Sequence, residues 1–364
     1  MNLEFSSDQQ FIREQARNFL TQECTPDRVR TAMESDDAYD KALWQQIVEL
    51  GWTAMAIPEE HGGLGLGALE LCVIAEELGR VAAPVPFSSS VFIATEAIKG
   101  WGSSTQQANY LPRLAAGEII GAFADCEGLV AAGTSTQFDN GKLTGTKLPV
   151  ADGDVADFAI VTAVGSDGQA GLYIVDLTTD NVTREALNSM DPSRSQATIT
   201  FNGAAAEPLG SAGSDALSAL LDQAAILIAF EQIGGAHAAL DMGMAYTTER
   251  YAFGRPVASF QAIKHKFADM YVAVELARSN AYYAASALTN AAEDLPLAAA
   301  TARVSATDAY YLSSKENIQA HGGMGFTWEF DCHFYYRRAQ MLSGVIGTQP
   351  HWKELVATRL LQAA

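Results

Sequence analysis

Apolar residues recur at helical spacing through the first third of the chain, with charged and polar residues between them. A further helical stretch over residues 68–81 follows a run of glycines and ends before Pro84. The two earlier apolar stripes are formed by Phe11, Ala16, Phe19 and Leu20, and by Leu43, Ile47 and Leu50. The pattern predicts an all-helical segment up to about residue 118.

The spacing of hydrophobic positions changes after about Ile119. Three runs rich in β-branched residues, DFAIVTAV, AGLYIVDL and QATITF, are separated by turn signals such as FDNGK and GSDGQ. In FDNGK, Asn140 and Gly141 form the pair that readily takes the positive φ values of a tight hairpin turn. This segment is therefore predicted to be a small set of antiparallel strands.

Helical spacing returns after residue 213 and continues to the C-terminus. Ser214 can cap a helix that runs to about Arg250, roughly 36 residues and ~54 Å long. A second helix follows Pro256, and a third begins near Pro296, a favourable proline of a first turn. The second helix carries apolar positions at alternating spacings of three and four: Phe260, Ile263, Phe267, Met270, Val274 and Ala277. That spacing is typical of a bundle seam.

Helices, then strands, then long helices predict an α+β chain of three domains. The expected limits are an N-terminal helical domain at residues 1–118, a small antiparallel β domain at 119–213, and a C-terminal four-helix-bundle-like domain at 214–364.

Composition excludes several classes of function. The 364 residues carry 23 Lys+Arg against 43 Asp+Glu, a net charge of -20, which disfavours a broad surface for nucleic acid or anionic lipid. The predicted helical residues His237 and His265 have no carboxylate or cysteine at ligand spacing, so no metal site is expected. Nor do the widely separated cysteines indicate a disulfide scaffold or zinc site: Cys24, Cys72, Cys126 and Cys332.

The N-terminus has charges where a signal peptide would need an apolar stretch, and no run of about 18 apolar residues occurs in the chain. We therefore expect a soluble, cytoplasmic protein that is not embedded in a membrane.

Two glycine clusters invite a dinucleotide-binding interpretation, and neither fits it. The form GxGxxA runs from Gly63 to Ala68, but Pro58 and two acidic residues precede it where a buried strand is required. The cluster HGGMGF, which begins at His321, follows a predicted helix instead of a strand.

The segment ERYAFGRPVASFQAIKHKFADM is more informative. It places Arg250 at the end of one long helix and Gln261 at the start of the next, with Gly254 and Pro256 between them. A guanidinium and a side-chain amide beside a helix N-terminus suit a diphosphate and a purine or ribose edge. On spacing alone, a solvated helix corner with a surface arginine is the plainer reading, so both stay open.

The same segment, with QAHGGMGF about sixty residues later, resembles the acyl-CoA dehydrogenase family, and AIPEEHGGLGL resembles that family's first helical domain. The resemblance covers essentially the whole chain. It implies a tetramer built from paired dimers, with FAD lying across a dimer interface. The residues that it implies as FAD contacts are Arg250, Phe253, Gln261, Gln319, Gly322 and Gly323.

The reaction implied by the resemblance is the α,β-dehydrogenation of an acyl-CoA thioester. A carboxylate removes the α proton while the β hydrogen leaves as hydride to the flavin. The resemblance also implies an electron-transfer flavoprotein as the electron acceptor.

The chain departs from the family where the catalytic base should be. The family usually places a glutamate before Gly-Thr near the C-terminus, and the matching stretch SGVIGTQ has Ile346 there. Some members carry the base early in the first long C-terminal helix, where DQAAILIAF offers only Ala224 and Ala225. No catalytic residue is therefore assigned.

The flavin-ring contacts implied by the resemblance are also altered. The family's Thr-Glu-Pro-Gly is matched only loosely by ADCEG at residues 124–128, and its downstream Trp and Thr are replaced by Pro149 and Ala151 in KLPVADG. Base and ring contacts are thus missing together, while the adenosine and pyrophosphate contacts remain.

Three functions stay open at this point. The first is the base-lacking subunit of a heteromeric enzyme, as in some bacterial members of the family that degrade sterols and other bulky substrates; its partner would be a related dehydrogenase subunit. The second is a self-sufficient homotetramer with a relocated base, for which Glu231 is the candidate. The third is a non-catalytic protein that binds an acyl-CoA or acts as a scaffold.

Overall fold

The computed structural model describes residues 6–128, 134–210, 212, 213 and 215–362. The chain divides into two compact units. The helical unit comprises the residues up to Val29, Ala68–Ala83 and the residues from Ala225 onward. The sheet unit comprises Arg30–Gly67 and Pro84–Ala224. Both units combine segments that are distant in the sequence, and the domain limits expected at residues 118 and 213 stay a prediction.

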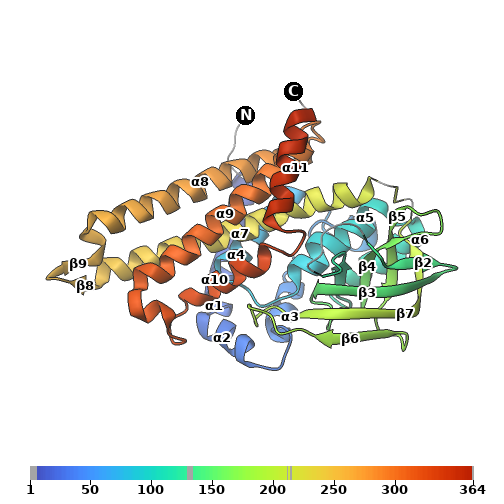
Figure 1. Ribbon diagram of the computed structural model, residues 1–364, viewed down its shortest axis with the longest axis horizontal. Helices are drawn as coiled ribbons and strands as arrows, with labels where there is room; N and C mark the ends of the chain where they lie inside the picture. The colour runs from blue at the N-terminus through green and yellow to red at the C-terminus, as the bar shows by residue number, and fades with distance from the viewer. Residues whose placement is uncertain (1–5, 129–133, 211, 214, 363–364) are drawn as a thin grey trace. The chain divides into compact units, whose positions relative to one another are not determined.

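The helical unit is built on long helices that run side by side, with α8 packed along α9 (Figure 1). Its helices are α1 (Ser7–Glu23), α4 (Ala68–Arg80), most of α7 (Ala216–Glu249), α8 (Gln261–Thr289), α9 (Leu295–His321), α10 (Cys332–Leu342) and α11 (Gln349–Gln362). Two very short strands, β8 (Tyr251–Ala252) and β9 (Arg255–Pro256), form a hairpin between α7 and α8, and the 3-10 turns Val257–Ser259 and Gly322–Phe326 complete the unit.

Local sequence explains several helix ends. Ser6 and Gln9 form a capping box at α1: the Ser6 hydroxyl accepts the Gln9 N–H at 3.2 Å, and the Gln9 side chain accepts the Ser6 N–H at 3.0 Å. Pro296 occupies the first turn of α9, as predicted. Ser214, the predicted cap of α7, lies outside the described residues.

The predicted seam of α8 is buried over only part of its length. Met270, Val274 and Ala277 are fully buried, whereas the earlier members, Phe260, Ile263 and Phe267, are half-buried. The apolar residues in the C-terminal part of this seam therefore pack inside the helical unit, whereas those near the start of α8 are partly exposed to solvent.

Two glycines let α4 and α7 cross with their backbones in contact. A Cβ added to Gly79 would lie 1.9 Å from the carbonyl oxygen of Glu231, and one added to Gly234 would lie 1.9 Å from that of Glu76. Each glycine thus makes room for the backbone of the other helix. By length and composition α7 could also cross a membrane, but 72% of its most apolar window is buried inside the protein, as in a core helix.

The sheet unit contains a seven-stranded sheet and short helices. Its strands are β1 (Gly121–Ala124), β2 (Gln137–Asp139), β3 (Lys142–Ala151), β4 (Phe158–Val164), β5 (Ala170–Asp176), β6 (Val182–Ala186) and β7 (Gln196–Pro208). Its helical segments are α3 (Lys41–Glu49), a 3-10 turn (Glu59–His61), a π-helical segment (Ser88–Thr95), α5 (Glu96–Trp101) and α6 (Ser104–Ala115), whereas α2 (Pro26–Glu34) begins in the helical unit.

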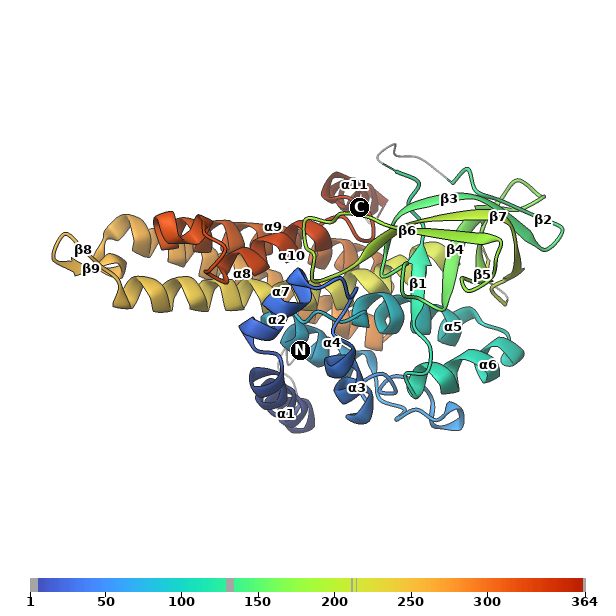
Figure 2. The same ribbon diagram turned by 90° about the horizontal axis from the view of Figure 1, so that it is seen from below.

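The sheet closes on itself, because β4, β2, β3, β7 and β5 pair in a ring and β6 pairs with β7. Figure 2 shows β3, β7 and β6 as neighbouring strands. The three predicted runs lie in β4, β5 and β7, and these strands pair antiparallel as expected. The expectation of an antiparallel sheet does not extend to β1 and β2, which pair with β4 in parallel. The chain enters β1 from α6 and not through a hairpin, and only directly joined strands must be antiparallel.

The predicted hairpin turn is confirmed. Asn140 and Gly141 have φ values of 48° and 75°, and they join β2 to β3 next to the pair Asp139 and Lys142.

Candidate functional site

Three of the residues implied as FAD contacts lie at the junction of α7 and α8. Arg250 follows the last residue of α7, Gln261 is the first residue of α8, and Phe253 is in the turn of the β8–β9 hairpin between them. The Val257 N–H donates to the Arg250 carbonyl at 2.8 Å, which fixes the base of this hairpin. Figure 1 shows the hairpin beyond the ends of both helices.

Phe253 is 97% exposed and has a φ of 53°, in the left-handed region that non-glycine residues seldom adopt. The Arg255 guanidinium lies 3.9 Å from the centroid of the Phe260 ring, which steadies the second strand of the hairpin. The hairpin therefore presents an aromatic ring to solvent at the end of the helical unit.

The other three implied contacts lie at the end of α9. The Gly322 N–H caps the helix by donating to the Gln319 carbonyl, and the φ of 60° at Gly322 suits a residue without a side chain. No described atom lies within 4 Å of a Cβ added to Gly322 or Gly323. The backbone is thus open to the close approach of another molecule. This open backbone fits the role of a cofactor contact.

An aromatic stack connects the two segments. The rings of Tyr246 and His321 lie 4.1 Å apart at an interplanar angle of 22°, and Phe330 meets both edge-on. Tyr246 is one turn before Arg250, whose N–H donates to the Tyr246 carbonyl at 2.9 Å, and His321 directly precedes Gly322. This stack could not be predicted from the sequence, since no local pattern pairs a residue of α7 with one at the end of α9.

The positions that match the family's catalytic base hold buried apolar residues. Ile346 is 4% exposed, and its carbonyl accepts the Trp352 Nε1 hydrogen at 3.0 Å. Ala224 and Ala225 are fully buried in α7. None of these three side chains can accept a proton.

Glu231, the candidate for a relocated base, is held in a buried ion pair. Its Oε1 lies 3.4 Å from Nη1 of Arg338, a residue of α10, and both side chains are nearly inaccessible. Arg338 also donates to the carbonyl oxygens of Ala82 and Ala83 just beyond α4, at 3.0 to 3.2 Å. The pair thus ties three segments of the helical unit together, and breaking it would leave a buried charge.

In the sheet unit, the stretch matched to the family's flavin contacts is anchored by a buried lysine. The fully buried Lys147 ammonium donates to Glu127 Oε1 at 2.6 Å and to the Asp125 carbonyl at 3.1 Å. It also donates to the hydroxyls of Thr134 and Thr162 at 2.8 and 3.0 Å. Burial opposes ionisation of Glu127, but hydrogen bonds from Lys147, Ser135 and Thr134 outweigh it and hold its pKa well below the usual range.

A second buried ion pair follows Ala151 directly. Asp152 is fully buried and accepts Arg194 Nη2 at 2.7 Å and the Ser89 hydroxyl at 2.5 Å, while Arg194 Nη1 donates to the Ser88 hydroxyl at 3.1 Å. The strand end that carries Pro149 and Ala151 is therefore fixed by the chain's own polar contacts. It adds no aromatic ring or hydroxyl at the two positions matched to the family's ring contacts.

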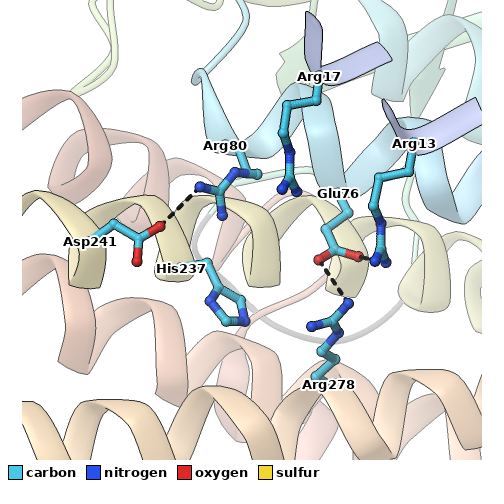
Figure 3. Close-up of a pocket in the computed structure, with 7 residues that line it drawn as sticks. All are labelled: Arg13, Arg17, Glu76, Arg80, His237, Asp241 and Arg278. Atoms are coloured by element: carbon cyan, nitrogen blue, oxygen red, sulfur yellow. Dashed lines mark hydrogen bonds and ion pairs between the residues drawn. The ribbon is translucent and has the colours of Figure 1, made fainter. Parts of the chain in front are cut away.

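The helical unit also contains a polar pocket of about 220 Å³ between α1, α4, α7 and α8 (Figure 3). It is lined by Arg13, Arg17, Glu76, Arg80, His237, Asp241 and Arg278. His237 has a carboxylate neighbour that its sequence spacing did not reveal, because Glu275 of α8 lies 3.4 Å from its Nε2. Among the described residues, no group of three or more His, Cys, Asp or Glu side chains could hold a metal ion.

Comparison with known proteins identifies the family. The family model for the N-terminal domain of acyl-CoA dehydrogenases matches residues 6–118, and the one for their C-terminal domain matches residues 211–361. The chain is 33% identical to the acyl-CoA dehydrogenase IpdE2 of Mycobacterium tuberculosis over 91% of each chain.

Solved structures agree with this assignment. The structure titled "Tcur3481-Tcur3483 steroid ACAD G363A variant" superposes with a TM-score of 0.90 at 30% identity and covers 98% of each chain. The ChsE4-ChsE5 complex of Mycobacterium tuberculosis gives a TM-score of 0.92 at 26% identity and covers 100% of this chain and 99% of the other. With helical N- and C-terminal domains around a central β region, and with these relatives, the chain belongs to the acyl-CoA dehydrogenase family of FAD-dependent oxidoreductases.

Proposed function

We propose that this chain is the base-lacking subunit of a heteromeric acyl-CoA dehydrogenase. The observation that carries the proposal is the replacement of both alternative base positions by buried apolar side chains, Ile346 at one and Ala224 or Ala225 at the other. The chain binds FAD together with a related subunit, and that subunit supplies the carboxylate that removes the α proton of the acyl-CoA. The assembly is a tetramer and works in the cytoplasm.

In this proposal the chain's residues bind and orient the cofactor. FAD held by these residues would supply the acceptor for the hydride that leaves the β carbon of the thioester. The Arg250 guanidinium suits a diphosphate, and the Gln261 amide at the start of α8 suits a polar edge of the adenosine. Gly322 and Gly323 let the cofactor approach the backbone, and the exposed Phe253 reaches beyond the subunit.

The nature of the relatives supports a heteromeric enzyme for bulky substrates. One similar structure is a complex of two chains, ChsE4 and ChsE5, and another is the steroid ACAD Tcur3481-Tcur3483. We therefore propose a sterol-derived or similarly bulky acyl-CoA as the substrate class. The electron acceptor proposed is an electron-transfer flavoprotein.

The rival function, a self-sufficient enzyme with Glu231 as its base, requires that carboxylate to be available to a substrate. In the structure Glu231 is 3% exposed and is paired with Arg338. A base in that position would have to give up the ion pair that joins α7 to α10, which makes this rival the weaker of the two.

The test is to purify the chain alone and with a related dehydrogenase subunit, and to measure flavin absorbance near 450 nm, mass in solution and acyl-CoA oxidation. We expect incomplete flavin and no activity for the chain alone, and both restored by the partner. Glu231→Gln leaves the buried Arg338 without its carboxylate, so the thermal midpoint of the variant is measured alongside. The folded variant complex should keep its turnover. A flavin-saturated, active homotetramer of this chain alone would contradict the proposal.

A further inference from the structure

The pocket between α1, α4, α7 and α8 is separate from every position discussed for flavin or base. Arg13 and Arg17 come from α1, Glu76 and Arg80 from α4, His237 and Asp241 from α7, and Arg278 from α8. Figure 3 shows the side chains of Arg17 and Arg80 reaching into the space from one side and Arg278 from the other. Four guanidinium groups around one hollow are unusual in a chain with a net charge of -20.

Part of this charge is neutralised inside the cluster. Glu76 is the central carboxylate, with Arg13 Nη2 at 3.1 Å and Arg278 Nη2 at 3.6 Å. Asp241 accepts Arg80 Nη2 at 2.9 Å. Beside the pocket, Glu77 accepts two hydrogen bonds from Arg17, at 2.6 and 2.9 Å, and Glu275 faces His237. The carboxylates hold the arginines in place and balance much of their charge.

The pocket nevertheless has more donors than the carboxylates use. Among the described residues, Arg80 makes its polar contact through Nη2 alone, to Asp241. Arg278 likewise uses only Nη2, toward Glu76 and the Tyr282 hydroxyl. Each guanidinium carries five N–H groups in a planar fork, so the Nε and Nη1 hydrogens of Arg80 and Arg278 remain for another acceptor. Their side chains are each 25% exposed, which gives a ligand access.

The acceptor that fits is a small oxyanion. A volume of about 220 Å³ suits an ion of a few heavy atoms and is smaller than the pockets that typically enclose drug-sized ligands. Guanidinium forks match the oxygen spacing of phosphate and carboxylate groups, and charge-assisted bonds of this kind are about twice as strong as neutral ones. Because Glu76 and Asp241 repel an anion, only one that engages several forks at once gains enough to bind.

We propose that this pocket is a binding site for one small tetrahedral oxyanion of the phosphate class, held between Arg80 and Arg278 with Arg17 at its rim. The anion is either inorganic phosphate or the terminal phosphate of a small monoester. Bound there, it links α1, α4 and α8 within the helical unit and stabilises this unit independently of any flavin.

The experiment is calorimetric titration of the full chain, purified in phosphate-free buffer, with inorganic phosphate at constant ionic strength. We expect one ion per chain, and we expect Arg80→Gln and Arg278→Gln each to weaken binding about tenfold or more, since each removes a charge-assisted contact. Arg113→Gln makes the same charge change on the exposed surface of α6 and should leave the dissociation constant unchanged.

Arg278→Gln also removes a partner of Glu76, so the thermal midpoint of each variant without phosphate shows whether it is folded. Arg80→Gln spares Glu76 and keeps the test valid if Arg278→Gln unfolds. A second titration with glycerol phosphate separates the two sources: tighter binding than phosphate identifies a monoester, and weaker binding identifies the free ion. No heat up to about 10 mM phosphate, or equal binding by Arg80→Gln and the parent chain, would overturn the proposal.

Discussion

The backbone contact between α4 and α7 predicts a large effect of a small substitution, Gly234→Ala. The new Cβ would lie 1.9 Å from the Glu76 carbonyl oxygen, and real Cβ atoms essentially never come closer than 3.0 Å to such a neighbour. The two backbones must therefore separate by at least 1.1 Å at this point. No flexible side chain can absorb the shift, because both partners are helical backbone.

The magnitude follows from two opposing terms. A gap of 0.5–1 Å already forfeits about a quarter to a half of a van der Waals contact, and overpacking of this kind costs about 1–3 kcal/mol. The higher helix propensity of alanine offsets about 1 kcal/mol of this loss in the free energy of unfolding. Since the clash is with fixed backbone, we take the upper end and expect a net loss of about 2 kcal/mol in the free energy of unfolding.

Urea unfolding followed by far-UV circular dichroism measures this loss. Gly100→Ala is the matched control, because Gly100 is also helical, in α5, and an added Cβ there meets nothing within 4 Å. That control should be neutral or more stable by about 0.5–1 kcal/mol. If Gly234→Ala were as stable as the control, the close crossing of α4 and α7 would be refuted.

Three further outcomes are expected. Tyr246→Ala should lower the affinity for FAD, measured by flavin fluorescence at a temperature where the flavin-free variant is still folded. Tyr246→Phe keeps the ring and should bind FAD normally, so an equal loss of affinity in both variants would refute a positioning role for the stack. Lys147→Met should cost about 3–5 kcal/mol in urea unfolding, because it leaves the Glu127 carboxylate without its cation, and adding Glu127→Gln should recover part of that loss. Burial lowers the pKa of His237 from its usual 6.5 and outweighs the opposing effect of the Glu76 carboxylate. The unfolded chain therefore takes up this proton at a higher pH than the folded chain does. The free energy of unfolding should fall as the pH drops below about 6.5. His237→Gln should flatten that pH dependence, and an unchanged slope would contradict it.

Local chemistry made some features predictable from the sequence. The Asn140–Gly141 turn needs two adjacent residues that tolerate positive φ, and Pro296 suits a first helical turn, so each signal is contained within a few residues. The parallel pairing of β1 and the partial exposure of Phe260 depend on neighbours distant in the chain, which no periodicity reports.

In the candidate site, too, the features set by local residues could be predicted and those set by distant neighbours could not. Motif spacing placed Arg250 and Gln261 correctly at two helix ends, because Gly254 and Pro256 between them disfavour a continuous helix. The Tyr246–His321 stack, the arginine pocket and the ion pair of Glu231 each join helices that are far apart in the sequence. From the sequence, Gly79 and Gly234 are only poor helix formers. The structure shows that they permit the close crossing of α4 and α7.

The tip of the β8–β9 hairpin has a consequence for how the protein behaves at different concentrations. A phenylalanine in the left-handed region costs on the order of 1–3 kcal/mol, and Phe253 is at the same time almost fully exposed. A subunit surface that covers the ring would gain about 1.5–3 kcal/mol from its burial. In the proposed assembly, dilution would remove that gain by mass action, so the thermal midpoint should rise with protein concentration. For the proposed assembly, the measured stability would then include a contribution from the contact that covers Phe253.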